Sequence, residues 1–196
     1  MDEFKTIKTI SEGYYTEKRS KFLAFAHPVT DVSQVKEIIA EYRKKYFDAR
    51  HVCYAYMLGA DRLEFRANDD GEPSSTAGKP ILGQINSNEL TDILIVVVRY
   101  YGGVNLGTSG LIVAYKAAAA DAIDHAEVIT RQVEEIVEYH FSYPMMNQVM
   151  RAPYRADFSS HQSISSAWLS STVIVAAATL SSFQRSTSAS PTVSGT

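Results

Sequence analysis

One acidic loop carries side chains of a type and spacing that could do chemistry. Asp69, Asp70 and Glu72 stand within four residues, in the segment that runs from Asn68 to Lys79. Carboxylates this close together can bind a hard cation, or act as a paired acid and base. A solvated acidic turn is the simpler interpretation, and it is the one that we favour.

A glycine-rich segment is the second candidate. Arg99, Tyr100 and Tyr101 follow the apolar run 92–98 and lead into four glycines, which are Gly102, Gly103, Gly107 and Gly110. A strand, a glycine-rich loop and a helix N-terminus in succession can hold an anion on free backbone N–H groups. The arginine could bind a phosphate and the tyrosines could stack on a base, with Lys79 and Arg66 as neighbours. A tight strand-to-helix crossover explains the glycines equally well.

Other kinds of catalytic or metal site receive no support. The glycines do not have the spacing G-x-G-x-x-G, and Gly71 is too far from Lys79 for a phosphate-binding P-loop, in which Pro80 would also replace the magnesium ligand. His51 and Cys53 share one face of a predicted strand but lack a third metal ligand, so we expect them to be packing residues. We therefore predict no catalytic residue, metal or cofactor.

Composition limits the choice of partner and compartment. Residues 1–150 hold 16 Lys and Arg against 21 Asp and Glu, a net charge of -5, so any contact with nucleic acid has to be local. The sequence contains a single cysteine, and no apolar stretch approaches the roughly 20 residues needed to cross a bilayer. We expect a cytoplasmic protein without a membrane segment.

Hydrophobic periodicity predicts a mixed α/β protein. The run 92–98 is typical of a central strand buried on both faces. We expect 4–10 and 21–29 to be strands of the same sheet, and 51–58 to form an antiparallel hairpin with 62–67. The other expected elements are a strand at 133–143 and four helices, one capped by Asp31, one opened by Pro80, one at 111–126 and one at 144–150.

The last 46 residues differ from the rest. From Ala152 onward there is no Lys and no Glu, and Ser and Thr supply 18 of the 46 residues. We expect weak structure here, except that the apolar run 172–180 could be a strand or a short helix. The segment is either a genuine Ser-rich tail or the product of a reading-frame change near codon 151.

Several motifs resemble the IMPACT/YigZ family in sequence, order and spacing. They are Ser20-Lys-Phe-Leu-Ala24, Ala49-Arg-His-Val-Cys-Tyr-Ala55, Asn68-Asp-Asp-Gly-Glu-Pro-Ser-Ser-Thr-Ala-Gly-Lys-Pro80 and Val98-Arg-Tyr-Tyr-Gly-Gly-Val-Asn-Leu-Gly107. The resemblance covers residues 1–130. It implies an α+β protein, with an N-terminal mixed-sheet α/β domain similar to a ribosomal small-subunit protein and to domain IV of the translocation elongation factor. In bacterial members a ferredoxin-like domain follows.

The resemblance also implies a division of the chain. Residues 1–130 form the IMPACT N-terminal-like domain, 131–151 supply the first strand and helix of the ferredoxin-like domain, and 152–196 are the Ser/Thr-rich tail. If the second domain is disrupted, the strand at 133–143 lacks its sheet.

Eukaryotic IMPACT proteins regulate translation by competing for an activator of the kinase that senses uncharged tRNA. For this chain the resemblance implies a translation-linked, non-enzymatic binding protein that contacts RNA, the ribosome or a translation factor. One alternative is an enzyme for a small molecule or phosphate ligand that uses the acidic and glycine-rich loops. In a third interpretation both loops only define the fold.

Overall fold

The computed structural model describes residues 3–141 and 171–179, in two compact units that divide between Arg131 and Gln132. The strands of the first unit are β1 (Glu3–Ile7), β2 (Ser11–Glu17), β3 (Ser20–Pro28), β4 (His51–Leu58), β5 (Glu64–Asn68), β6 (Ile93–Tyr100) and β7 (Val128–Gln132), of which only the last residue of β7 is beyond the division. Its helices are α1 (Val32–Lys45), α2 (Gly78–Ser87) and α3 (Gly107–Asp124). The second unit contains β8 (Glu134–Phe141) and β9 (Ser171–Thr179).

A five-stranded sheet with the order β2-β3-β6-β4-β5 forms the centre of the first unit. Its middle strand, β6, is buried from Ile93 to Arg99, which explains the continuous apolar run and confirms the predicted central strand. The α+β class is also confirmed. Every pairing in this sheet is antiparallel, however, so the sheet is not mixed as predicted.

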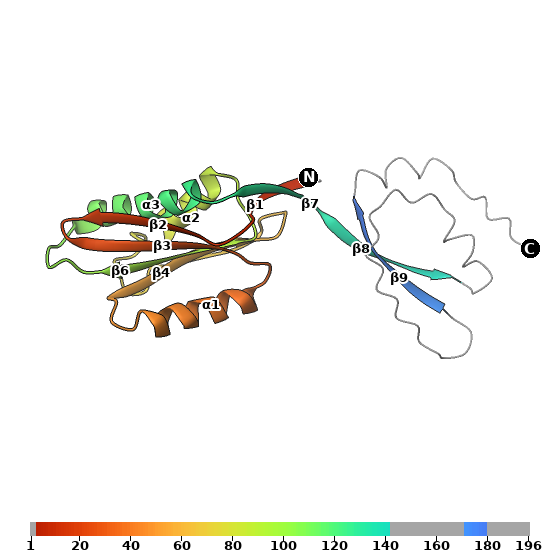
Figure 1. Ribbon diagram of the computed structural model, residues 1–196, viewed down its shortest axis with the longest axis horizontal. Coiled ribbons are helices and arrows are strands. Elements are labelled where there is room, and N and C mark those ends of the chain that lie inside the picture. Colours follow the sequence, from red (N-terminus) through yellow and green to blue (C-terminus); the bar gives the residue numbers. More distant parts are fainter. Residues whose placement is uncertain (1–2, 142–170, 180–196) are drawn as a thin grey trace, which may run out of the picture. The chain divides into compact units, whose positions relative to one another are not determined.

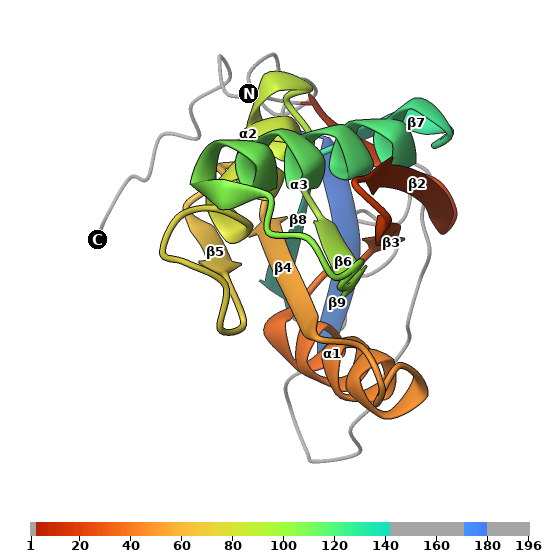
Figure 2. The same ribbon diagram turned by 90° about the vertical axis from the view of Figure 1, so that its left-hand side faces the viewer.

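Helices cover both faces of this sheet (Figures 1 and 2). On one face α1 buries Val35 and Ile39 against the strands, and Asp31 caps the helix as predicted, by accepting hydrogen bonds from the backbone N–H groups of Ser33 and Gln34. On the other face lie α2 and α3, whose buried residues form a second core cluster with Phe22 and other sheet residues. The sheet therefore separates two hydrophobic cores.

The N-terminal strands differ from the prediction. β2 was not predicted, and it pairs with β3 as an edge strand, while β1 pairs with β7 in a separate two-stranded sheet. The segment of β2 is largely polar because one face of the strand is exposed, so it cannot be recognised as a strand from a run of apolar residues. Gly13 lets β2 approach α3 closely, since a Cβ at this position would lie 2.3 Å from the backbone nitrogen of Ala122. The helix predicted to open at Pro80 begins two residues earlier, at Gly78.

The second unit contains a strand pair. β8 is antiparallel to β9, with a shift of register between Glu135 and Ile136. The apolar run in the tail is thus a strand, and it pairs with the strand predicted at 133–143. The predicted helix at 144–150 and the rest of the tail lie outside the described residues.

Across the helices that the structure describes, none has the length and apolar character required to span a membrane.

Candidate functional site

The candidate site lies where β6 ends and β4 begins. In the sheet register Arg99 is paired with Phe22 on one side and with His51 on the other. Phe22 belongs to the core beneath α2 and α3, so side chains at these paired positions lie on the same face of the sheet. Arg99 and His51 are thereby directed toward α2 and α3.

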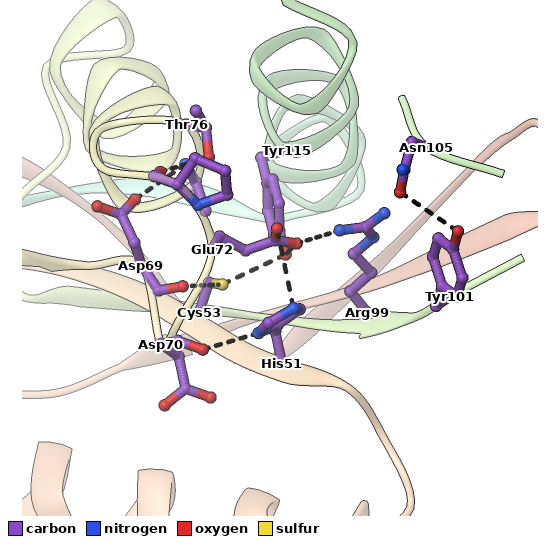
Figure 3. A network of polar contacts seen from close by, with 12 residues as sticks. His51, Cys53, Asp69, Asp70, Glu72, Thr76, Arg99, Tyr101, Asn105 and Tyr115 are labelled. Carbon is purple, nitrogen blue, oxygen red and sulfur yellow. Dashed lines mark hydrogen bonds and ion pairs between the residues drawn. The ribbon is translucent and has the colours of Figure 1, made fainter. Parts of the chain in front are cut away.

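Glu72 joins the acidic loop to this end of the sheet (Figure 3). Its Oε1 accepts hydrogen bonds from Nη1 of Arg99, at 2.5 Å, and from the Tyr115 hydroxyl of α3, at 2.8 Å. Nε2 of His51 lies 3.8 Å from Oε2. The Glu72 side chain is only 3% exposed, and a carboxylate so deeply buried requires a charge partner and hydrogen bonds to remain ionised.

Arg99 is equally enclosed. Its side chain is 6% exposed, and its Cζ lies 5.6 Å from the ring centroids of both Phe22 and Tyr101. In the described part of the chain its Nε has no hydrogen-bond partner. A side chain in this position, already paired with Glu72, is not free to contact a phosphate, so the prediction that Arg99 contacts a phosphate directly has to be corrected.

Asp69 holds the start of α2. Its Oδ1 accepts hydrogen bonds from the backbone N–H groups of Ala77 and Gly78, and its Oδ2 accepts one from Ser75. Burial alone would raise the pKa of this carboxyl, but these hydrogen bonds, together with the charge of Lys79, lower its pKa below the usual value. Asp69 therefore acts as a helix cap from eight residues upstream.

Asp70 links the loop to two other elements. Its Oδ2 accepts a hydrogen bond from the backbone of Val52 at 2.7 Å, and its Oδ1 forms an ion pair with Arg43 of α1 at 2.7 Å. Its carbonyl oxygen accepts a hydrogen bond from Nδ1 of His51. With Glu72 buried as well, the favoured interpretation of this loop as a solvated acidic turn is wrong.

Cys53 and Tyr115 complete the buried cluster. The Sγ of Cys53 lies 3.1 Å from the carbonyl oxygen of Asp69 and 3.3 Å from the Tyr115 hydroxyl. Burial raises the pKa of both side chains, so Cys53 remains a thiol and packs in the core, as predicted. Tyr115 was not predicted as a site residue, although a lone tyrosine in an alanine-rich helix is a signal that could have identified it.

The residues of the glycine-rich loop point in different directions. Tyr100 donates a hydrogen bond to Asp48 and packs with the core beneath α1, on the face opposite Arg99. Tyr101 is 49% exposed, and its hydroxyl lies 3.3 Å from Oδ1 of Asn105. The sequence prediction placed both tyrosines on one surface. In the structure Tyr100 packs on the α1 side, whereas Tyr101 follows the end of β6 and its ring lies 5.6 Å from Cζ of Arg99.

The three site glycines each meet a backbone requirement. A Cβ on Gly102 would lie 2.2 Å from the backbone carbon of Arg19, while Gly103 and Gly107 have positive φ values of 84° and 72°. Backbone geometry therefore accounts for all three: Gly102 packs against the β2–β3 turn, and Gly103 and Gly107 shape the crossover to α3.

Lys79 and Arg66 are exposed but belong to other places in the fold. Lys79 lies in the first turn of α2. Arg66 is in the edge strand β5, where it pairs with Tyr56, which in turn pairs with Leu94 of β6. Leu94 and Arg99 are separated by five residues of extended strand, or roughly 16 Å. The structure does not bring Arg66 to the Arg99 cluster.

No group of three or more His, Cys, Asp or Glu side chains is arranged to hold a metal ion within 3–133, the range whose side chains the structure describes.

The fold and the buried cluster define a small α+β domain in which an antiparallel sheet has helices on both faces and an acidic loop is anchored at one end of the sheet. The family model of the Impact N-terminal domain matches residues 18–123, more than half of the chain. The chain belongs to the IMPACT family, as its motifs indicated.

Two bacterial relatives and one solved structure illustrate the similarity. IMPACT family member YvyE of Bacillus subtilis (strain 168) is 32% identical over 149 residues, which are 76% of this chain and 69% of YvyE. IMPACT family member YigZ of Escherichia coli (strain K12) is 38% identical over 124 residues, 62% of this chain and 60% of YigZ, so the match spans less than two thirds of that relative. A crystal structure of a hypothetical protein has a TM-score of 0.75 at 27% identity, covering 94% of this chain and 91% of the other.

Proposed function

We propose that this protein is a non-enzymatic, translation-associated binding protein of the IMPACT family, and that it contacts the ribosome or its RNA in the cytoplasm. Family membership supports the association with translation. The observation that carries the non-enzymatic part is that the acidic-loop carboxylates are all engaged inside the fold. Asp69 caps α2, Asp70 binds Arg43 and β4, and Glu72 is paired with Arg99.

These internal contacts matter because general acid–base catalysis needs a side chain within hydrogen-bond reach of the substrate. Glu72 is 3% exposed, and its charge is balanced by a buried arginine. Cys53 is fully buried and stays protonated, so it lacks the thiolate that a cysteine nucleophile requires. The polar residues of this site therefore support an architectural role, with recognition on the exposed surface.

The test is co-sedimentation of the full chain with purified ribosomes, and separately with free RNA, over a series of salt concentrations. We expect the protein to pellet with ribosomes at low salt and to be released as the salt concentration rises. Contacts with phosphates release bound counterions, and this release becomes less favourable at high salt. Circular dichroism of the same sample verifies that the protein is folded. A folded protein that stays in the supernatant at low salt with both ribosomes and RNA would overturn the proposal.

A further inference from the structure

We propose that one end of the five-stranded sheet binds single-stranded RNA. This surface, called here the basic end, consists of residues 17–21 in the β2–β3 turn, 43–50 at the junction of α1 and β4, and 100–105 in the glycine-rich loop. The inference rests on the proposed function, since it names the surface and the class of partner through which this protein would contact the translation apparatus.

The sheet register brings the three segments together. Lys21 of β3 pairs with Tyr100 of β6, and the backbone N–H of Arg50 donates to the carbonyl of Arg99. β6 lies between β3 and β4, so the outer two strands are about 10 Å apart. In Figure 1 the three connections gather at the left of the first unit, and Figure 2 faces this end.

Positive charge is concentrated at the basic end, although residues 1–150 as a whole are acidic. The segments 17–21 and 43–50 contain seven Lys and Arg but only two acidic residues, whereas residues 1–150 carry a net charge of -5. Arg43 is engaged with Asp70, and Lys45 lies 5.1 Å from the ring centroid of Tyr46. The remaining five basic side chains are exposed: Lys18, Arg19, Lys21, Lys44 and Arg50.

Helix electrostatics explains only part of this charge. Basic residues in the last turn of α1 interact favourably with the helix dipole, which accounts for Arg43, Lys44 and Lys45. It does not account for Lys18 and Arg19, which form a two-residue turn with φ values of 45° and 65°. Such a turn favours Asn-Gly. Two basic side chains therefore occupy positions that the local backbone does not favour, as expected if their charge serves binding.

The basic end also carries exposed aromatic rings, which favour binding of single-stranded RNA over double-stranded RNA. Phe47 is 85% exposed, the largest fraction among the large apolar side chains of the described residues, and Tyr101 is 49% exposed. Unpaired bases stack on such rings while basic side chains follow the phosphates. In a duplex the bases are stacked on each other and cannot do so.

The first test measures binding of fluorescein-labelled oligouridylate to the full chain by fluorescence anisotropy. Phe47→Ala should lower the affinity roughly 5- to 150-fold, the range typical of losing one stacked base. Leu63→Ala is the matched control, because Leu63 is 78% exposed but follows the opposite end of β4. The Leu63→Ala variant should bind the oligouridylate with the same affinity as the unaltered chain.

The second test separates binding from folding. The double change Lys18→Asn and Arg19→Gly gives the turn its preferred residues, so the melting temperature should rise while RNA affinity falls. The slope of log affinity against log salt should become shallower by about 0.7 for each phosphate that the variant no longer neutralises. Lys116→Gln, an exposed lysine on α3, should leave both quantities unchanged.

The outcomes distinguish the two proposals. If the folded chain binds neither ribosomes nor RNA, the proposed function itself fails. If the chain binds ribosomes or RNA but Phe47→Ala and the turn variant bind like the unaltered chain, only the basic end is overturned. Binding to ribosomes without binding to single-stranded RNA would also overturn the RNA assignment, and would indicate a protein contact instead.

Discussion

A buried carboxylate and a buried guanidinium depend on each other, so at the scale of single residues Glu72 and Arg99 should be coupled in stability. Glu72→Gln should lower the free energy of unfolding by about 3–5 kcal/mol, because it leaves the charge of Arg99 without a partner. Adding Arg99→Met should recover about 2 kcal/mol relative to the sum of the single changes. Urea denaturation of the three variants measures this coupling.

A surface pair provides the control for that experiment. Lys5 and Glu89 are also ion-paired, but their side chains are 50% and 73% exposed. Glu89→Gln should therefore leave the urea midpoint unchanged. A similar midpoint shift for Glu72→Gln and Glu89→Gln would show that the Glu72–Arg99 pair does not anchor the acidic loop.

Asp69 should give stability a specific dependence on pH. Its pKa is lower in the folded chain than in the unfolded chain, so its contribution is fully present above the unfolded value of about 4 and is lost as pH falls through the folded value. Asp69→Asn should lower the free energy of unfolding by about 2 kcal/mol at pH 7, because it weakens the cap of α2. The stability of this variant should also fall less steeply below pH 4 than that of the unaltered chain. Thermal melts between pH 2.5 and 7 measure both effects. If the melting temperature of the variant fell with pH as steeply as that of the unaltered chain, this role of Asp69 would be contradicted.

The sequence singles out individual residues of the buried cluster but does not predict their contacts. The types of Asp69, Glu72 and Arg99 marked them as candidates, but whether a carboxylate faces solvent or an arginine depends on contacts between residues 27 positions apart, as in Glu72 and Arg99. Tyr100 and Tyr101 show the same limit, since Tyr100 packs with the core beneath α1 while the ring of Tyr101 lies beside Arg99. Spacing along the chain does not encode such long-range pairings.

At the scale of elements, the contact between β2 and α3 should be sensitive to a single methyl group. A Cβ at Gly13 would lie 2.3 Å from the backbone nitrogen of Ala122, and neither backbone can move without disturbing the packing. Gly13→Ala should therefore lower the free energy of unfolding by about 3 kcal/mol or more. Guanidinium denaturation measures this effect.

Gly83 of α2 provides the matched glycine. No atom lies within 4 Å of a Cβ at this position, and the residue is exposed within a helix. Gly83→Ala should stabilise the protein by about 0.5–1 kcal/mol, because alanine has the better helix propensity. If both glycine variants changed stability equally, the close approach of β2 to α3 would be refuted.

Elements with a clear apolar pattern could be predicted from the sequence. β6, α1 with its Asp31 cap, and the β4–β5 hairpin lie where periodicity and turn residues indicated. β2 was missed because it is a polar edge strand, and the pairing of β1 with β7 joins the two ends of the first unit. Such distant pairings are decided by the tertiary fold rather than by local pattern.

At the scale of the whole molecule, the distribution of charge supports a local contact. An acidic protein avoids broad attraction to nucleic acid, while a confined basic patch can still direct one partner to one place. The same end of the sheet carries the exposed rings of Phe47 and Tyr101. Ion pairs with Arg99 and Arg43 tie the acidic loop to β6 and α1 beside this end.

The most direct test of this account is to map the amide chemical shifts of the isotope-labelled full chain by NMR as single-stranded oligouridylate is added. The account predicts that the largest changes occur at residues 17–21, 43–50 and 100–105, saturate with RNA concentration and disappear at high salt. Saturable changes centred instead on the opposite end of the sheet, near Leu63, or the absence of any change at low salt, would contradict it.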